Sequence, residues 1–394
     1  MSRLRVVFAI GGMHGGGSER QLVQLLRHLD RSAFQPFLYL AQRAGPLLGQ
    51  VPEDVPIHVS DERIRPPRFY MPGRMHALRV RDYAALLQQL QADVSYDRTF
   101  LMTLITAAGA QRAGIPNVST VVTNPETGFA PVAGRFQWLK RRILHRLYNR
   151  SSQVLAVSGG VRESAIRFYG IDPEKIRVQY NGIDVDQIRD VSGVAVENSW
   201  WQAGPRVPGR RLLKVVSAGR LNHEKGFHLL IEAVARMGAR RADCELRVAL
   251  LGEGSHRARL QSQIDRAGLG DAIRMPGFEP RAAAWIASAD VCVLPSLVEG
   301  MPNVLLEALV CGTPVIAADC PSGPSEVLEQ GRLGLLVPVN DAAAISAAME
   351  QILDLPERAA ERVAAGRVSI EERWTIQGAT RRLEGCLQEA ANRR

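Results

Sequence analysis

Short apolar runs of five to seven residues alternate with helical stretches through most of the chain, in two successive series. Alternation of this kind indicates parallel sheets with helices on both faces, because parallel strands are joined by crossover helices. The sequence therefore predicts two α/β units. The expected strands are 5–10, 35–41, 56–60, 92–96, 117–122, 153–158 and 175–180 in the first series, and 213–219, 246–252, 273–277, 290–296, 314–319 and 334–338 in the second.

The division between the two series falls in the segment "SGVAVENSWWQAGPRVPGR" at 192–210. This segment is rich in Gly, Pro and polar residues and has neither helical nor strand periodicity, so it is interpreted as a linker or surface excursion. The last residues have apolar side chains at helical spacing, which predicts a terminal helix. We expect this helix to pack back on the first domain. The expected domains are 1–191 and 212–375, with 192–211 as the linker and 376–394 as the helix.

The charge of the 394-residue chain is uneven: residues 1–192 carry 25 Lys and Arg but only 16 Asp and Glu, whereas 193–394 carry 24 of each. A basic half indicates an anionic partner there, such as lipid phosphates, a diphosphate-bearing substrate or nucleic acid. The apolar runs are too short to span a bilayer, and the N-terminus does not have the pattern of a signal peptide. Five cysteines without paired spacing indicate a reducing, cytoplasmic setting.

Glycines are concentrated in "GGMHGGGSER" at 11–20, which follows a strand and opens a helix. Glycines at such a turn let backbone N–H groups approach a phosphate, which the helix dipole also favours. A tight turn that binds nothing is an equal alternative. The segment has neither G-x-G-x-x-G nor the Gly-Lys-Ser/Thr of a P-loop, so NAD binding and ATP hydrolysis are disfavoured.

Two cations, Arg220 and Lys225, follow a strand of the second series within "SAGRLNHEKG". At the carboxyl end of a parallel strand such a pair suits a diphosphate, since Arg offers a bidentate fork and Lys a point charge. The alternative is a solvated loop with an ion pair between Glu224 and Lys225. The turn "LGEGSH" at 251–256 also follows a strand, and either borders a nucleoside or is an ordinary connection.

Two carboxylates, Glu299 and Glu307, lie eight residues apart in "EGMPNVLLE". Pro302 suits the start of a helix over about 303–310, whose first N–H groups point out of the helix. Asn303 and Glu307 share a helix face. A hydroxylated ligand across this terminus could contact both carboxylates, whereas in isolation the pair would be two solvated acids on a capped helix.

These motifs occur together and in order, and as a set they resemble glycosyltransferase family four, whose fold is GT-B, two Rossmann-like domains facing each other across a cleft. The resemblance covers essentially the whole chain and includes "AVS" at 156–158 and "YNGID" at 180–184. Its most specific part is "ADVCVLPSLVEGMPNVLLEALVCGTPVIAADCPSGPSEVL" at 289–328. "DCPSGPSEVL" resembles bacterial members that build lipid-linked oligosaccharides and surface polysaccharides, including hexosamine transferases.

The resemblance implies retaining transfer of a hexose or N-acetylhexosamine from a UDP- or GDP-linked donor to a lipid-linked or polysaccharide acceptor, with no metal and no cofactor. Arg220 and Lys225 would neutralise the diphosphate, and Glu307 would take the ribose hydroxyls. Glu253 and Gly254 would lie beside the nucleoside. The donor sugar would be held by Glu299, Gly300, Met301, Pro302, Asn303 and Val304, and the donor phosphate or acceptor would be approached by Gly16 and Gly17.

On the acceptor side the chain departs from the family pattern. Many relatives have a histidine or another basic residue after the strand that corresponds to 117–122, where this chain has "TNPETG". Asn124 and Glu126 are therefore the candidates for an acceptor-side role.

Three other interpretations compete. Asp184 and Asp186 mimic a Mn²⁺-binding Asp-x-Asp but follow "YNGI", where the family has Gly-Ile/Val-Asp. A glycoside hydrolase also uses two carboxylates, but has little need for a cation pair. A non-enzymatic basic module that binds membranes or nucleic acid is the third, because 135–150 has six Lys and Arg and no acid.

No recognised nucleic-acid motif accompanies that basic stretch, so nucleic acid is not expected as a partner. An amphipathic helix resting on anionic lipid is plausible, with Lys140, Arg141 and Arg142 as contacts to the membrane or to the acceptor. A plain surface helix is the alternative. The expectation is an enzyme that is peripheral on the inner face of the bacterial cytoplasmic membrane.

Overall fold

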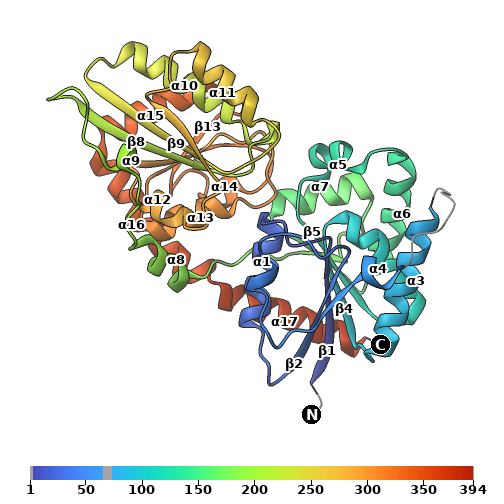
Figure 1. Cartoon of the computed structure of the whole chain (residues 1–394). Coiled ribbons are helices and arrows are strands. Elements are labelled where there is room, and N and C mark those ends of the chain that lie inside the picture. The colour runs from blue at the N-terminus through green and yellow to red at the C-terminus, as the bar shows by residue number, and fades with distance from the viewer. Residues whose placement is uncertain (1–2, 65–72, 394) are drawn as a thin grey trace. The chain divides into compact units, whose positions relative to one another are not determined.

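The computed structural model describes residues 3–64 and 73–393, which form two compact units (Figure 1). The first unit consists of two segments, the chain up to Gly182 and the chain from Ile376 onward. The second unit is Ile183–Thr375. The second unit therefore begins ahead of the segment interpreted as a linker. Within the described residues, no helix is both long and apolar enough to cross a membrane.

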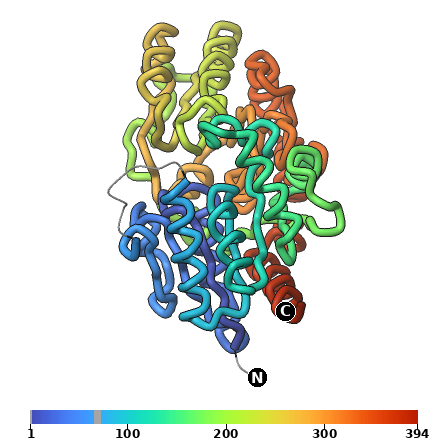
Figure 2. Tube along the Cα trace, turned by 90° about the vertical axis from the view of Figure 1, so that its right-hand side faces the viewer, coloured from blue at the N-terminus to red at the C-terminus, as the bar shows by residue number. Residues whose placement is uncertain are grey.

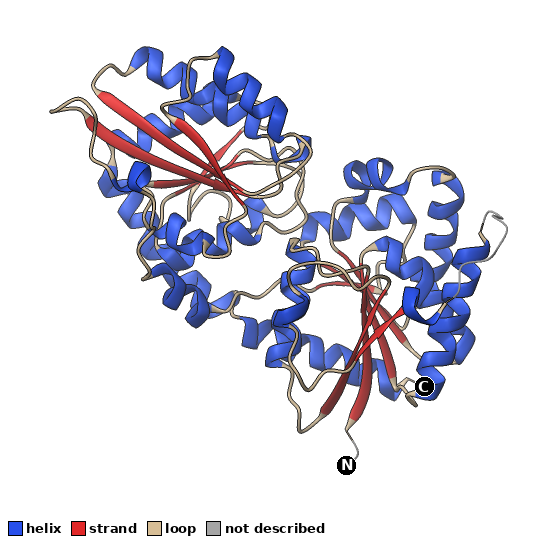
Figure 3. Ribbon diagram, viewed as in Figure 1, coloured by secondary structure: helices blue, strands red, loops and turns tan. Residues whose placement is uncertain are grey.

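The first unit contains a seven-stranded parallel sheet in the order β3-β2-β1-β4-β5-β6-β7, with helices on both of its faces (Figure 3). Tyr96 of β4 packs on Phe8 of β1 with ring centroids 5.3 Å apart, in a core that includes α1 and the C-terminal helix. The strands are β1 (Leu4–Ile10), β2 (Phe34–Leu40), β3 (Ile57–Val59), β4 (Val94–Arg98), β5 (Asn117–Val121), β6 (Gln153–Ala156) and β7 (Ile176–Val178).

The helices of this unit follow the strands, as the crossovers of a parallel sheet require. They are α1 (Gly17–His28), η1 (Leu48–Gln50), α2 (Ser60–Arg63), α3 (Arg74–Gln89), α4 (Phe100–Ala113), α5 (Pro125–Ala133), α6 (Gln137–Arg150), α7 (Gly159–Tyr169) and α17 (Ile376–Asn392).

The second unit contains a six-stranded parallel sheet in the order β10-β9-β8-β11-β12-β13. Its strands are β8 (Arg211–Ala218), β9 (Cys244–Leu251), β10 (Ile273–Gly277), β11 (Val291–Leu294), β12 (Val315–Ala318) and β13 (Leu335–Val337). Its helices are α8 (Val185–Ser192), α9 (Ser199–Gln202), η2 (His223–Lys225), α10 (Phe227–Arg240), α11 (Arg257–Arg266), α12 (Ala282–Ala287), α13 (Asn303–Cys311), α14 (Pro324–Val327), α15 (Ala342–Asp354) and α16 (Pro356–Arg373).

Every strand expected from the sequence is present, within about two residues at each end. Helix α17 packs on α1 and beside β4 and β5, so residues 376–392 complete the core of the first unit (Figure 2). Its inward face includes Leu383 and Leu387, which are fully buried.

The segment 192–210 is less of an open excursion than its composition indicates, because it contains the short helix α9. Trp200 and Trp201 of that helix are buried, and the Trp201 ring lies 5.2 Å from that of Trp285 in α12. Two adjacent indoles bury enough apolar surface to hold the segment against the rest of the second unit. The linker interpretation, which rests on the Gly, Pro and polar content, does not anticipate this packing.

Candidate active site

The carboxyl edge of the second sheet brings together the loops that follow β8, β9 and β11. The loop after β8 contains Arg220, which is exposed, and ends in η2 with Lys225. Gly226 then starts α10 with a φ of +66°, and a Cβ there would lie 2.0 Å from the carbonyl oxygen of Pro295. The loop after β11 is thus seated directly on the loop that presents the two cations.

Lys225 and Glu299 form the central ion pair of this edge. The Lys225 Nζ atom donates to Glu299 Oε1 at 2.6 Å, and the same oxygen accepts from Ser296 Oγ at 2.7 Å. The side chains of Lys225 and Glu299 are 22% and 7% exposed. The backbone N–H of Leu297 also donates to the carbonyl of Glu224, which ties the two loops together. The alternative pairing of Lys225 with Glu224 is not what the structure has.

The N-terminus of α13 adjoins this pair. Pro302 is its N-cap and supplies no side-chain hydrogen bond, and the N–H groups at the start of an α-helix have no carbonyl partner within the helix. Gly323 packs against this loop with φ of +96°, and a Cβ there would lie 2.6 Å from Pro302 Cδ and 3.0 Å from the Gly300 carbonyl oxygen. A helix start whose N-cap side chain makes no hydrogen bond, with its positive dipole, favours a polar or anionic ligand.

The turn after β9 is fixed to the loop that contains Arg220. Leu221 donates its N–H to the carbonyl of Glu253 and accepts from the N–H of His256. Gly254 lies so close that a Cβ on it would be 2.4 Å from the Leu221 carbonyl oxygen. The Glu253 carboxylate itself forms an exposed ion pair with Arg257 at 2.9 Å. The turn therefore offers backbone groups, rather than a free carboxylate, beside Arg220.

Glu307 lies half-buried on α13, one turn after Asn303. Burial raises the pKa of the Cys311 thiol to about 12, and the field of Glu307 adds to this shift. Burial also raises the pKa of Cys292, again with a contribution from Glu307.

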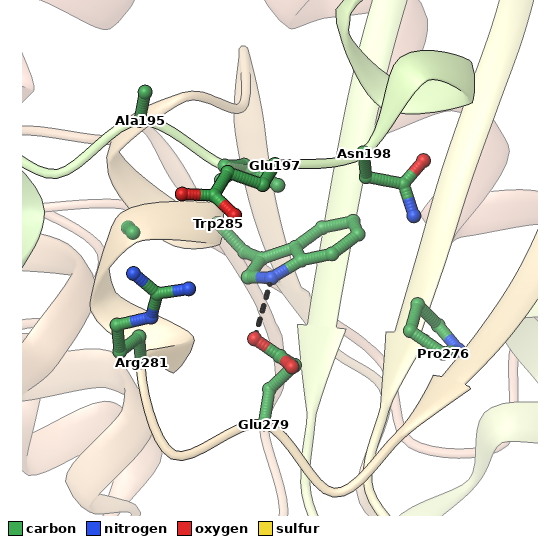
Figure 4. A pocket seen from close by; sticks show the side chains of 9 residues that line it. Ala195, Glu197, Asn198, Pro276, Glu279, Arg281 and Trp285 are labelled. Carbon is green, nitrogen blue, oxygen red and sulfur yellow. Dashed lines mark hydrogen bonds between the residues drawn. The ribbon is translucent and has the colours of Figure 1, made fainter.

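A cavity of about 280 Å³ lies at the end of β10 and is shown in Figure 4. Trp285 lies at the centre of its lining, and the indole N–H donates to Glu279 Oε2 at 2.9 Å. Glu197 lies across the indole ring from Glu279, and Arg281 lies beside the ring. Gly277, two residues before Glu279, is also the neighbour of Glu253, because a Cβ on it would lie 3.0 Å from Glu253 Oε1. The described residues that line the cavity do not include the turn after β9 itself.

In the first unit, Gly16 is the N-cap of α1 and makes no side-chain hydrogen bond, and Gly17 is the first helical residue. The Glu19 carboxylate folds back over this end, since a Cβ on Gly16 would lie 2.6 Å from Glu19 Oε2. A carboxylate near a helix N-terminus stabilises the helix. An anionic ligand at this position would have to displace it.

Asn124 and Glu126 both have structural partners within the first unit. Asn124 is the N-cap of α5, and its Oδ1 accepts from the N–H of Glu126 and from Ser164 Oγ at 2.6 Å. Glu126 forms an ion pair with Arg167 at 2.8 Å, and this pairing lowers the pKa of the carboxyl. These contacts explain the positions of both side chains without any bound acceptor substrate. Their role on the acceptor side therefore stays a prediction.

Asp184 is the N-cap of α8, where its Oδ1 accepts from the N–H of Gln187 at 3.0 Å. This contact explains the Asp-x-Asp sequence as a helix start. Among the residues described, no cluster of three or more His, Cys, Asp and Glu side chains is arranged to hold a metal ion.

Sequence reasoning proposed Arg220, Lys225 and Glu299 as site residues. It did not point to Ser296, which shares the Glu299 oxygen, or to the close approaches at Gly226 and Gly323. The dipeptide Pro295-Ser296 directly after a strand could have indicated a polar group at this edge. The glycine contacts could not have been found, because they join residues distant in sequence.

Two family models match the chain, one on each unit. "Glycosyltransferase Family 4" matches residues 15–187, and "Glycosyl transferases group 1" matches residues 209–368. The first match begins within the glycine-rich turn before α1, and the second includes Arg220, Lys225, Glu299 and Glu307.

Relatives and solved structures agree with these models. WcaL of Salmonella typhimurium, named for colanic acid biosynthesis, is 32% identical over 62% of this chain, and the alignment spans 58% of its own length. The D-inositol 3-phosphate glycosyltransferase of Pseudarthrobacter chlorophenolicus is 28% identical over 77% of this chain and 72% of its own. HepE of Anabaena, solved with UDP-glucose, matches at a TM-score of 0.80 with 21% identity, covering 98% of this chain and 100% of its own.

The lipopolysaccharide outer core galactosyltransferase WaaB is a further structural match, with a TM-score of 0.68 at 17% identity over 96% of this chain and 98% of its own. Both sheets, their strand order and the helices between them are those of the GT-B fold. The group 1 model matches the second unit and the family 4 model matches the first, and the chain belongs to the group 1 glycosyltransferases.

Proposed function

We propose that the chain transfers a hexose or N-acetylhexosamine from a nucleotide sugar, UDP- or GDP-linked, to a lipid-linked or polysaccharide acceptor. The observation that carries the proposal is the Lys225–Glu299 pair at the carboxyl edge of the second sheet, beside the N-terminus of α13. Ligands of open α/β sheets bind at this edge. Relatives and structural neighbours named for UDP, UDP-glucose or lipid-linked acceptors support the substrate class.

In the proposed mechanism, Arg220 and Lys225 neutralise the charge that develops on the departing diphosphate. Lys225 is oriented for this role by Glu299, because the hydrogen bond at 2.6 Å fixes the ammonium group between the two loops. Glu299 in turn has a second oxygen for a sugar hydroxyl, and the first-turn N–H groups of α13 lie beside it. The nucleoside lies along Glu253 and Gly254, with Glu307 on the ribose.

We propose further that the transfer retains the anomeric configuration, needs no metal, and takes place at the inner face of the cytoplasmic membrane. The two cations would do what a metal ion does elsewhere, which is to stabilise the charge on the departing diphosphate. The basic residues of α6 and the acceptors of relatives such as the diphospho-undecaprenol transferase of Campylobacter jejuni support the membrane setting.

The test is nucleotide release from a panel of UDP- and GDP-sugars, with and without lipid-diphosphate acceptors, and with and without excess EDTA. We expect release from at least one donor, stimulated by an acceptor and unchanged by EDTA. Activity that is lost on chelation and restored by Mn²⁺ or Mg²⁺ would contradict metal independence, and the absence of release from every donor would contradict the transfer itself.

A further inference from the structure

The corner between α5 and α6 exposes an unusual amount of apolar surface. Val132, Phe136, Trp138 and Leu139 are 56%, 55%, 68% and 40% exposed, within eight consecutive residues. Exposed apolar residues that gather in this way mark an interaction site rather than ordinary surface.

Beside this corner, α6 and the end of α7 enclose a groove of about 440 Å³. Trp138, Arg141, Arg142 and His145 line one side of it, and their spacing places them on one face of α6. The other side is the last turn of α7, from Arg167 to Gly170. None of the described residues that line this α6–α7 groove is acidic.

The end of a helix normally disfavours an anion, because its carbonyl groups point outward. Here side chains of α6 cover those carbonyls. Arg141 Nε donates to the Phe168 carbonyl at 2.6 Å, with the guanidinium 4.4 Å from the Phe168 ring centroid. Asn149 Nδ2 donates to the Gly170 carbonyl at 2.9 Å, and His145 Nδ1 lies 2.8 Å from the Tyr169 carbonyl. The groove is therefore positive despite its position.

The charge of the surrounding sequence points the same way. No Asp or Glu occurs from Thr127 to Arg162, a stretch that contains seven Lys and Arg. Arg167 is balanced by its pairing with Glu126, whereas Arg142 and Arg146 are exposed on α6. A compact anion next to apolar groups matches both the basic lining and the exposed corner.

We propose that the α6–α7 groove binds the phosphate headgroup of an anionic phospholipid, while the apolar corner enters the bilayer interface. A phospholipid has this combination of an anion and an adjoining apolar part. A nucleic acid or an acidic peptide would leave Val132 and Leu139 in water. The inference adds a lipid site to the proposed function, and it concerns the first unit, whereas donor binding is assigned to the second.

The distribution of tryptophan gives a direct readout. Of the five tryptophans, Trp138 is 68% exposed, whereas Trp200, Trp201, Trp285 and Trp374 are at most 8% exposed. A brominated phospholipid quenches an indole only at close range. With phosphatidylglycerol vesicles that contain brominated lipid, we expect quenching and a blue shift in the full-length protein, and neither effect with pure phosphatidylcholine.

Binding to the same vesicles is measured by flotation. Each basic residue near an anionic surface contributes about fivefold in affinity, so Arg142→Gln should weaken binding by about that factor. Trp138→Ala should weaken it by roughly tenfold, because the indole no longer enters the interface. Matched controls lie in the second unit: Arg266→Gln removes one exposed charge, and Val368→Ala removes an apolar side chain that is 58% exposed. Neither control should alter binding.

Several outcomes would overturn the proposal. It is wrong if Arg142→Gln and Trp138→Ala float like the wild type, or if the wild type binds phosphatidylcholine equally well. It is also wrong if binding requires a lipid diphosphate in neutral vesicles, because the groove would then belong to the acceptor. Calorimetry with UDP and GDP is run on the same variants. If the variants still bind nucleotide but no longer float with the vesicles, the result supports the lipid site in the groove. If the wild type itself binds neither UDP nor GDP, the result counts against the proposed transfer and not against the groove.

Discussion

A lysine and a glutamate at the edge of the second sheet hold each other in position. The Lys225–Glu299 pair is largely shielded from water, so removing one partner leaves the other charge poorly compensated. Arg220 differs, because its side chain is exposed. The roles of the two cations can therefore be separated experimentally. Substitution of Lys225 should change both activity and stability, whereas substitution of Arg220 should change activity alone.

Arg220→Ala should lower turnover by about 10²–10³, since removing one preorganised transition-state contact costs about 2.7–4 kcal/mol. Its free energy of unfolding should stay within about 0.5 kcal/mol of the wild type, because the side chain is exposed. Lys225→Ala should show a similar loss of turnover and also destabilise the fold, at the low end of about 3–5 kcal/mol. Nucleotide release and thermal unfolding measure the two effects.

The control is Lys214→Ala, which removes another lysine of the second unit. Lys214 belongs to β8, and its ammonium group lies over the Trp201 ring of α9. Near-normal turnover in both Arg220→Ala and Lys225→Ala would remove the assigned roles, whatever their stability.

The thiols of the chain give a prediction that depends on pH. Burial raises the pKa of Cys311 and Cys320 to about 12 and raises those of the other three cysteines as well. At pH 8 the folded protein should therefore resist iodoacetamide at all five, whereas the chain in guanidinium chloride should react at all five. Mass spectrometry counts the adducts, and rapid labelling of the native protein would show that a buried thiol is accessible.

The raised cysteine pKa values also determine whether the folded protein gains or loses stability at alkaline pH. Above the ordinary thiol pKa of about 8.5, the unfolded chain releases protons that the folded chain keeps. The free energy of unfolding should therefore fall as the pH rises through 9 and 10.

At the level of elements, the strands could be predicted and the site's closest contacts could not. Buried parallel strands are short apolar runs, so their positions are visible in sequence. Helix α13 was also visible, because Pro302 marks its start. Gly226 contacts Pro295, 69 residues away, and Gly323 contacts Pro302, 21 residues away. No local sequence pattern predicts contacts between segments so far apart. The buried indoles of α9 were missed for the same reason.

Helix α10 offers an internal comparison of two glycines. Gly226, at its start, has φ of +66° and no room for a Cβ, whereas a Cβ on Gly238, in the helix interior, would have nothing within 4 Å. Gly226→Ala should destabilise by about 1–3 kcal/mol and weaken nucleotide binding. Gly238→Ala should stabilise by about 0.5–1 kcal/mol and leave binding unchanged. Equal effects of the two substitutions would show that the loop contact is unimportant.

Helix α17 supplies the core of the first unit from the far end of the sequence. Leu387→Ala should cost about 2–5 kcal/mol, because the side chain is fully buried. Hydrogen exchange should then accelerate in α1, β4 and β5, with which α17 packs, and stay unchanged in β8 and β9. Acceleration confined to the second unit would contradict the assignment of α17 to the first.

At the scale of the whole molecule, the two units divide the proposed work. The second presents Arg220, Lys225, Glu299 and the start of α13 at one sheet edge and is assigned the donor. The first has the excess positive charge and the exposed corner at α6, and is assigned the acceptor side and the membrane. This division requires that nucleotide contacts be concentrated in the second unit.

Hydrogen exchange of the full-length protein with and without UDP or GDP tests that requirement most directly. The donor site predicts protection of residues 219–226, 252–256 and 299–304, and the loss of that protection in Lys225→Ala. The α6–α7 groove should be unaffected by nucleotide in both proteins. Protection that is absent from these three loops and appears elsewhere in the chain would contradict the placement of the donor at the carboxyl edge of the second sheet.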